Sequence, residues 1–143
     1  MLANRRILVL ESDPAHEGLV VQALRALGAG SIEVARDALE ALDHLVREPP
    51  ELRAEVLVLE VGPAVGAGLE VLTAIRDDPV TAPLPAVVLS TSAEQERLVA
   101  ACFGTIFPCV RKPIDIVRLR VALERAGGAI LEREAPSAPS LRV

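Results

Sequence analysis

Glu55-Val56-Leu57-Val58-Leu59-Glu60 contains an aliphatic run that ends on a carboxylate, and the predicted fold is built around it. Its apolar residues do not alternate with polar ones, which predicts a strand buried on both faces of a sheet. Glu60 is then expected where the strand emerges, at the carboxyl edge of the sheet. Ligands of open parallel α/β sheets bind outside that edge.

Three further apolar runs have the same form. Each of them ends in polar or charged residues: residues 7–10 end at Glu11-Ser12-Asp13, residues 86–89 end at Ser90-Thr91-Ser92, and a short run around Cys109-Val110 ends at Arg111-Lys112-Pro113. Because the carboxyl ends of parallel strands share one edge, carboxylates, a hydroxyl and an ammonium are expected to converge there.

The segments between these runs carry apolar residues at helical spacing. Helix N-termini are predicted at three pairs of residues: Asp13 with Pro14, Asp37 with Glu40, and Ser92 with Gln95. The second helix is expected to bury its large aliphatic side chains, which are Leu39, Leu42, Leu45 and Val46. The last helix is expected to face the sheet with Ile116, Leu119 and Leu123.

Strands and helices alternate along the whole chain in this prediction, which indicates a parallel sheet covered by helices on both faces. Right-handed crossovers leave few topologies for such a chain. The strand order 2-1-3-4-5 places the first and third strands side by side, so Glu11 and Glu60 are expected to be neighbours. The predicted fold class is α/β, a flavodoxin-like three-layer sandwich with a five-stranded parallel sheet and five helices.

Composition narrows the class of protein. The chain has 143 residues, enough for one domain, and a net charge of -5 with two aromatic residues, which argues against binding nucleic acid. Its first apolar run is too short for a signal peptide or a membrane span, so a cytoplasmic protein without a membrane partner is expected. The domain is placed at residues 1–134, with a flexible tail at 135–143. Cys102 and Cys109 are expected to be inert buried thiols.

Over about residues 5 to 127 the chain resembles the receiver domain of bacterial two-component response regulators, which has the CheY-like form of this fold. The resemblance rests on motifs that occur in the family's order: Glu11-Ser12-Asp13-Pro14, the strand ending at Glu60, Gly68-Leu69-Glu70, the strand ending at Ser90, and Lys112-Pro113, whose peptide is usually cis in the family. Ser90-Thr91-Ser92-Ala93-Glu94 and Asp77-Asp78-Pro79 further resemble the single-domain regulators that partner phytochrome-type kinases.

The resemblance implies a specific chemistry. In the family, an aspartate at the end of the central strand accepts phosphate from a kinase histidine. Mg²⁺ is held by that aspartate, by an acidic pair and by a backbone carbonyl. The resemblance places these roles at the following residues: the acceptor at Glu60, the acidic pair at Glu11 and Ser12, the carbonyl at Gly62, the switch hydroxyl at Ser90, the lysine at Lys112 and the aromatic switch position at Cys109.

Four positions depart from the family's pattern. Glu60 stands for an aspartate, Ser12 for a carboxylate and Cys109 for an aromatic residue, and Ala64 stands where the family has a loop proline. Since Mg²⁺ requires near-octahedral oxygen ligands, its binding at Glu11, Ser12, Glu60 and Gly62 is expected to be weak or absent, and no cofactor is expected. Glu60 is interpreted as a phosphate mimic that pairs with Lys112. The alternatives are a solvated charge at a strand end and a genuine acceptor.

Several of the remaining polar residues and glycines have other possible roles. Ser90 and Thr91 are also compatible with hydroxyls that bond the local backbone. The glycines at 62, 66 and 68 lack the ending of a phosphate-binding loop, so a nucleotide is not expected. His16 and His44 are expected to be surface histidines.

The predicted function is that of a non-enzymatic signalling module with a degenerate phosphorylation site, which acts through protein–protein interaction with a histidine kinase or another signalling protein. One alternative is a functional phosphoacceptor, and a second is a structural dimerisation domain. The last helix has a second apolar face at Val117 and Val121, with Ile130 and Leu131 beyond it. This face predicts a homodimer.

Overall fold

A parallel sheet forms the middle layer of the molecule. The computed structural model describes residues 2–62 and 66–132. Its elements in chain order are β1 (Arg6–Leu10), α1 (Pro14–Ala26), β2 (Ser31–Ala35), α2 (Ala38–Arg47), β3 (Val56–Glu60), α3 (Gly66–Asp77), β4 (Ala86–Ser90), α4 (Ala93–Phe103), β5 (Cys109–Arg111) and α5 (Ile116–Glu132). The strand order is β2-β1-β3-β4-β5, with every pairing parallel, so the predicted topology is confirmed.

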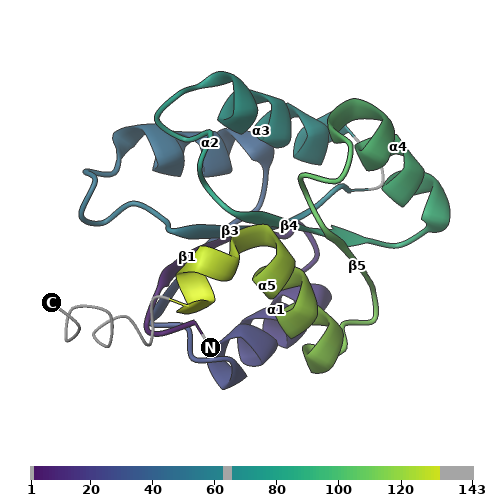
Figure 1. Ribbon diagram of the computed structural model, residues 1–143, viewed down its shortest axis with the longest axis horizontal. Coiled ribbons are helices and arrows are strands. Elements are labelled where there is room, and N and C mark those ends of the chain that lie inside the picture. The colour runs from purple at the N-terminus through teal and green to yellow at the C-terminus, as the bar shows by residue number, and fades with distance from the viewer. Residues whose placement is uncertain (1, 63–65, 133–143) are drawn as a thin grey trace, which may run out of the picture.

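Helices cover both faces of this sheet, as Figure 1 shows: α2, α3 and α4 lie on one side and α1 and α5 on the other. Each side has its own apolar core. In β3, Leu57 and Leu59 belong to the core under α2, α3 and α4, whereas Val56 and Val58 belong to the core under α1 and α5. Because neither face of β3 meets water, its sequence has no need of polar residues until the strand ends.

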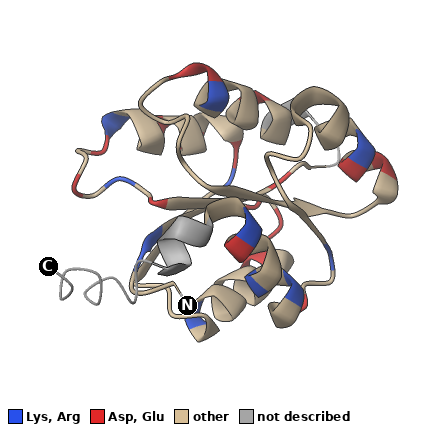
Figure 2. Ribbon diagram, in the orientation of Figure 1, with Lys and Arg blue, Asp and Glu red and all other residues tan. Residues whose placement is uncertain are grey.

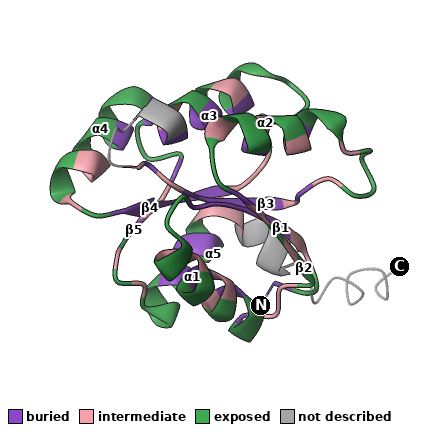
Figure 3. Cartoon of the chain, turned by 180° about the vertical axis from the view of Figure 1, so that it is seen from behind, coloured by how far each residue is buried: buried purple, intermediate pink, exposed green. Residues whose placement is uncertain are grey.

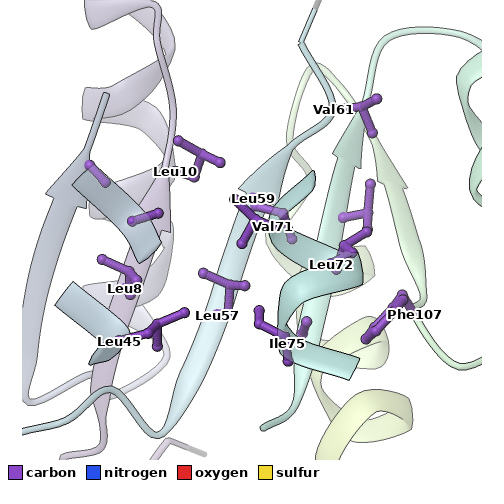
Figure 4. Close-up of a cluster of buried hydrophobic side chains, with 14 of the residues drawn as sticks. Leu8, Leu10, Leu45, Leu57, Leu59, Val61, Val71, Leu72, Ile75 and Phe107 are labelled. Atoms are coloured by element: carbon purple, nitrogen blue, oxygen red, sulfur yellow. The ribbon is translucent and has the colours of Figure 1, made fainter. Parts of the chain in front are cut away.

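The first of these cores is seen in Figure 4, where leucines of β1 and β3 meet Leu72 and Ile75 of α3. Figure 3 shows the strands as mostly buried and the outer faces of the helices as exposed. Charged residues follow the same division, since in Figure 2 they lie on helices and loops and are sparse on the strands.

The predicted helix starts are confirmed by hydrogen bonds. The side chain of Asp13 accepts from the Ala15 amide at 2.9 Å, and that of Asp37 accepts from the Glu40 amide at 2.8 Å. Ser92 Oγ accepts from the Gln95 amide at 3.2 Å. These caps satisfy backbone donors that the first turn of a helix leaves unpaired.

Three predictions of burial are wrong. Leu39 and Val46 are 78% and 76% exposed, because α2 rests on the sheet through the face that carries the buried Ala41 and Leu45. Ile116, at the first position of α5, is 40% exposed. The spacing of apolar residues therefore predicted the helices correctly, but the face that each helix buries is narrower than that spacing indicated.

The thiols also differ from expectation. Cys102 is exposed on α4, so its predicted burial is wrong, and Cys109 is only partly buried in β5. No described helix is long and apolar enough to cross a membrane.

Gly68 explains how α3 reaches the end of β3. A Cβ at this position would lie 2.6 Å from the Glu60 carbonyl oxygen, which is closer than real contacts allow. Helix α3 starts at Gly66, so the glycines at 66 and 68 belong to its first turn, and α5 is kinked at Gly127. The predicted tail at 135–143, the loop positions 63 and 64 and the domain end at 134 lie outside the described residues.

Candidate functional site

Glu11 and Glu60 lie beside each other at the carboxyl edge of the sheet. Leu10 of β1 pairs with Leu59 of β3, so the residue that follows each of them is brought to the same place. Glu11 is fully buried, and the Glu60 side chain is 12% exposed. Two carboxylates that stand 49 positions apart in the sequence thus face one small region, at a switch point of the strand order.

Lys112 lies between these carboxylates. Its Nζ is 2.7 Å from Glu11 Oε1 and 3.5 Å from Glu60 Oε2, and its side chain is 10% exposed. The residue follows β5, its amide donates to the Ser90 carbonyl at 2.8 Å, and its peptide bond with Pro113 is cis. The pairing of Glu60 with Lys112 that the sequence suggested is therefore present, and Glu11 shares the same ammonium at a shorter distance.

Ser12 is a hydrogen-bond donor to Glu60. Its amide donates to Glu60 Oε1 at 2.7 Å, and its hydroxyl donates to the same oxygen. Asp13, the next residue, is turned to cap α1. Ser12 thus holds the Glu60 carboxylate by two donors.

His16 joins this cluster, which the sequence analysis did not foresee. Its Nδ1 is 3.0 Å from Lys112 Nζ and 3.6 Å from Asp13 Oδ2. Because an ammonium has only donors, Nδ1 accepts in the contact with Lys112. A histidine three residues into the first helix has no sequence signal that points to a lysine 96 positions later.

The environment shifts the two carboxyl pKa values in opposite directions. Burial raises the pKa of Glu11, and the neighbouring Glu60 adds to this, although Lys112 opposes it. Burial acts to raise the pKa of Glu60 too, but hydrogen bonds from Glu11 and Ser12 and the charge of Lys112 outweigh it, so this pKa lies below its usual value. Glu60 is therefore the more firmly ionised of the two carboxyl groups.

Ser90 is fully buried at the end of β4, and its hydroxyl is directed to α4. Ser90 Oγ donates to Glu96 Oε2 at 2.6 Å and lies 3.5 Å from the Val110 carbonyl. Arg111 holds the same carboxylate through Nε at 2.6 Å and Nη2 at 3.0 Å. These hydrogen bonds from Arg111, against a smaller opposing effect of burial, lower the pKa of Glu96 to about 2. The bond of Ser90 to a side chain was not among the partners expected from the sequence.

The Gly62 carbonyl faces α4 as well. Gln95 Nε2 donates to it at 3.3 Å, while Gln95 Oε1 accepts from the Thr91 amide at 2.8 Å. A cavity of about 210 Å³ lies between these groups and Glu60. In the described part of the chain, no three His, Cys, Asp or Glu side chains are arranged to hold a metal ion.

Comparison of this sequence with models of known protein families shows which family it belongs to. The model of the response regulator receiver domain matches residues 7–124 of this chain. The chain belongs to this family. The fold described above is thus that of a receiver domain, a signalling module of two-component systems.

Known proteins are also similar to this chain over most of its length. An uncharacterized 14.6 kDa protein of Leptolyngbya boryana is 35% identical over 118 residues, which cover 82% of this chain and 86% of the relative. A probable methanogenesis regulatory protein, FilR2, of Methanothrix harundinacea is 31% identical over 121 residues, 82% of this chain and 78% of its own length.

Solved structures are similar too. The bacteriophytochrome response regulator AtBRR superposes with a TM-score of 0.75 at 29% identity, covering 86% of this chain and 92% of that one. The bacteriophytochrome response regulator RtBRR gives a TM-score of 0.74 at 26% identity, covering 99% and 96%. The predicted likeness to regulators associated with phytochromes is therefore confirmed at the level of similarity.

Between α4, β5 and α5 the receiver domain presents a groove of about 560 Å³. Cys109 is one of the residues that line it, and burial raises the pKa of its thiol. Val117 and Val121, which are 64% and 40% exposed, line its α5 side. The two valines thus lie on a solvent-facing surface, as the sequence analysis expected of them.

Proposed function

We propose that this receiver domain is a signalling module that binds protein partners without being phosphorylated. One observation carries the proposal: the carboxylate at the acceptor position is already engaged. Glu60 Oε1 accepts from the amide and the hydroxyl of Ser12, and Glu60 Oε2 lies 3.5 Å from Lys112 Nζ. A carboxylate held in this way resembles a bound anion more than a free nucleophile.

The charge state of Glu60 supports its role as a permanent substitute for a phosphoryl group. Its pKa is lowered by hydrogen bonds from Glu11 and Ser12 and by the charge of Lys112, despite the opposing effect of burial. An ionised Glu60 supplies a negative charge next to the lysine that would otherwise meet a phosphoryl oxygen. The alternative of a merely solvated charge is less well supported, because the side chain is only 12% exposed.

The residues present do not fit a magnesium ion well. The family's metal is held by oxygens, and here each candidate oxygen has another partner: Ser12 Oγ donates to Glu60, Glu11 accepts from Lys112, and the Gly62 carbonyl accepts from Gln95. Mg²⁺ gives up its waters reluctantly and requires strict geometry. We therefore propose that its binding is weak or absent and that the domain works without a cofactor.

Protein contacts then remain as the route of signalling, and we propose a cytoplasmic partner such as a histidine kinase or another signalling protein. We also propose that a second copy covers Val117 and Val121, since isologous pairing is the commonest way for identical chains to bury an apolar patch. Val117→Glu should convert a dimer to a monomer in sedimentation without unfolding it. Leu39→Glu, at an exposed leucine on α2, is the matched control and should leave the dimer unchanged. A monomer at high concentration would favour a different protein as the occupant.

The runner-up function is a working phosphoacceptor. Incubation with acetyl phosphate and Mg²⁺, followed by intact mass, separates the two. Our proposal expects no adduct on the wild-type chain. The double variant Ser12→Asp with Glu60→Asp restores the family's carboxylates and should gain one phosphate. A stable phosphate on the wild-type chain that Glu60→Gln removes would contradict the proposal.

A further inference from the structure

Ser90 ends β4, the strand next to the one that ends at Glu60, but its hydroxyl takes no part in the contacts among Ser12, Glu60 and Lys112. Its proton is committed to Glu96 Oε2 at 2.6 Å. In the part of the chain that the structure describes, no hydrogen bond joins Ser90 Oγ to Glu60 or Lys112. Ser90 also does not line the 210 Å³ cavity beside Glu60, whereas its neighbours Leu89 and Thr91 do.

Glu96 is itself fixed in place by Arg111. The guanidinium donates through Nε at 2.6 Å and Nη2 at 3.0 Å, one bond to each carboxylate oxygen. A bidentate pair of this kind restricts orientation as well as supplying energy. Ser90 therefore meets a carboxylate that is held in one position, and a carboxylate can only accept, so the hydroxyl must donate to it.

The hydrogen bonds that link Ser90, Glu96 and Arg111 connect three elements. Ser90 ends β4, Glu96 lies in α4 and Arg111 ends β5. Glu96 and Arg111 also line the groove that contains Val117 and Val121. The residues that fix the buried hydroxyl are thus the same ones that a protein seated in the groove would touch.

We propose that Glu96, oriented by Arg111, is a positioning residue that holds the Ser90 hydroxyl away from Glu60 and Lys112. This inference rests on the proposed function and deepens it: the site is kept in one arrangement from both sides, by Ser12 on the acceptor carboxylate and by Glu96 on the hydroxyl. An anion placed beside Lys112 would have to take the hydroxyl from Glu96 before Ser90 could donate to it.

The first test uses the double variant Ser12→Asp with Glu60→Asp, in which beryllofluoride with Mg²⁺ serves as the phosphoryl probe. Adding Glu96→Ala should tighten beryllofluoride binding about three- to tenfold, because the competing charged hydrogen bond is gone. Glu96→Gln keeps an acceptor oxygen and should give a smaller gain. Glu94→Ala, in the same first turn of α4, should change nothing. A merely structural role for Glu96 predicts unchanged or weaker binding, and either result would overturn the inference.

The second test uses the wild-type background and needs no anion. Ser90→Ala, Glu96→Ala and the two together are compared by their urea unfolding midpoints. If the two side chains share one hydrogen bond, the second substitution should add little to the first. Additive losses would overturn the inference. If the double variant of the first test binds no beryllofluoride at all, the account of the acceptor site fails, and the urea cycle still decides whether Glu96 positions Ser90.

Discussion

Two carboxylate–cation pairs lie near the same edge of the sheet, and they differ in burial rather than in distance. Glu11 meets Lys112 at 2.7 Å with side chains that are 0% and 10% exposed. Glu96 meets Arg111 at 2.6 Å with side chains that are 30% and 44% exposed. Water screens the second pair, whereas the first has lost most of its hydration and depends on its partners.

The buried cluster is also unbalanced in charge. Lys112 is shared by Glu11 and Glu60, and the second carboxylate is compensated by hydrogen bonds from Ser12. The exposed pair is balanced one to one. Two ion pairs of nearly equal length therefore serve different purposes. The Glu11–Lys112 pair determines whether the site is stable, and the Glu96–Arg111 pair determines where the Ser90 hydroxyl points.

Removing the shared cation should have the largest effect. Lys112→Met leaves two buried carboxylates without their ammonium and should cost about 3–5 kcal/mol of unfolding free energy at pH 8. Urea unfolding measures the loss. Arg111→Met, on the exposed pair, is the matched control and should move the urea midpoint far less. Equal losses from the two variants would mean that burial does not distinguish the pairs.

Apolar side chains should show the same contrast between buried and exposed positions. Leu59→Ala, directly before Glu60 in the fully buried strand, should lower the unfolding free energy by about 2–5 kcal/mol through lost burial and a cavity. Leu39→Ala, at the 78% exposed leucine of α2, should change it by less than about 0.5 kcal/mol. A loss at Leu59 as small as that at Leu39 would show that β3 is not the centre of the core.

The effect of pH on stability should be smaller than the effects of these substitutions, and it should have opposite signs for Glu96 and Glu11. The folded-state pKa of Glu96 is about 2, below its ordinary value of 4.5. Its ionised form therefore stabilises the fold above pH 4.5, and this contribution disappears as the pH falls toward 2. Glu96→Gln should therefore cost less than about 1 kcal/mol at neutral pH and nothing near pH 2.

Glu11 should behave in the reverse way. Burial raises the pKa of Glu11 above 4.5 in the folded state, so above pH 4.5 the folded state retains a proton that the unfolded state loses. The contribution of Glu11 to stability therefore falls as the pH rises from 4.5 through the folded-state pKa. Urea unfolding of Glu11→Gln between pH 4 and pH 8 should show the variant gaining on the wild type with rising pH. A gain with falling pH would assign the lowered pKa to Glu11 instead of Glu60.

The sequence predicted those features that depend on local pattern. The β3 run, the helix caps at Asp13 and Ser92 and the strand ends that carry Glu11 and Lys112 are all set by neighbouring residues or by the rules of parallel sheets. Their convergence followed from the strand order, and the structure has that order.

Features that depend on which face of a helix is turned inward did not follow from the sequence. Leu39 is exposed because α2 makes only a narrow contact with the sheet. His16 contacts Lys112 although β1, which precedes α1, is not a neighbour of β5 in the sheet. The bond from Ser90 to Glu96 was missed for the same reason, since spacing along α4 does not reveal that position 96 points back at β4. Side-chain direction between elements needs the packed structure.

We propose that the contacts among Ser12, Glu60 and Lys112 leave no site for a divalent cation. Titration with Mg²⁺, followed by the backbone amide resonances of residues 11–13 and 60–62, tests it most directly. We predict no saturable shifts for the wild-type chain at millimolar Mg²⁺, and saturable shifts confined to these residues in the Ser12→Asp, Glu60→Asp variant. Saturable binding by the wild-type chain would contradict the account.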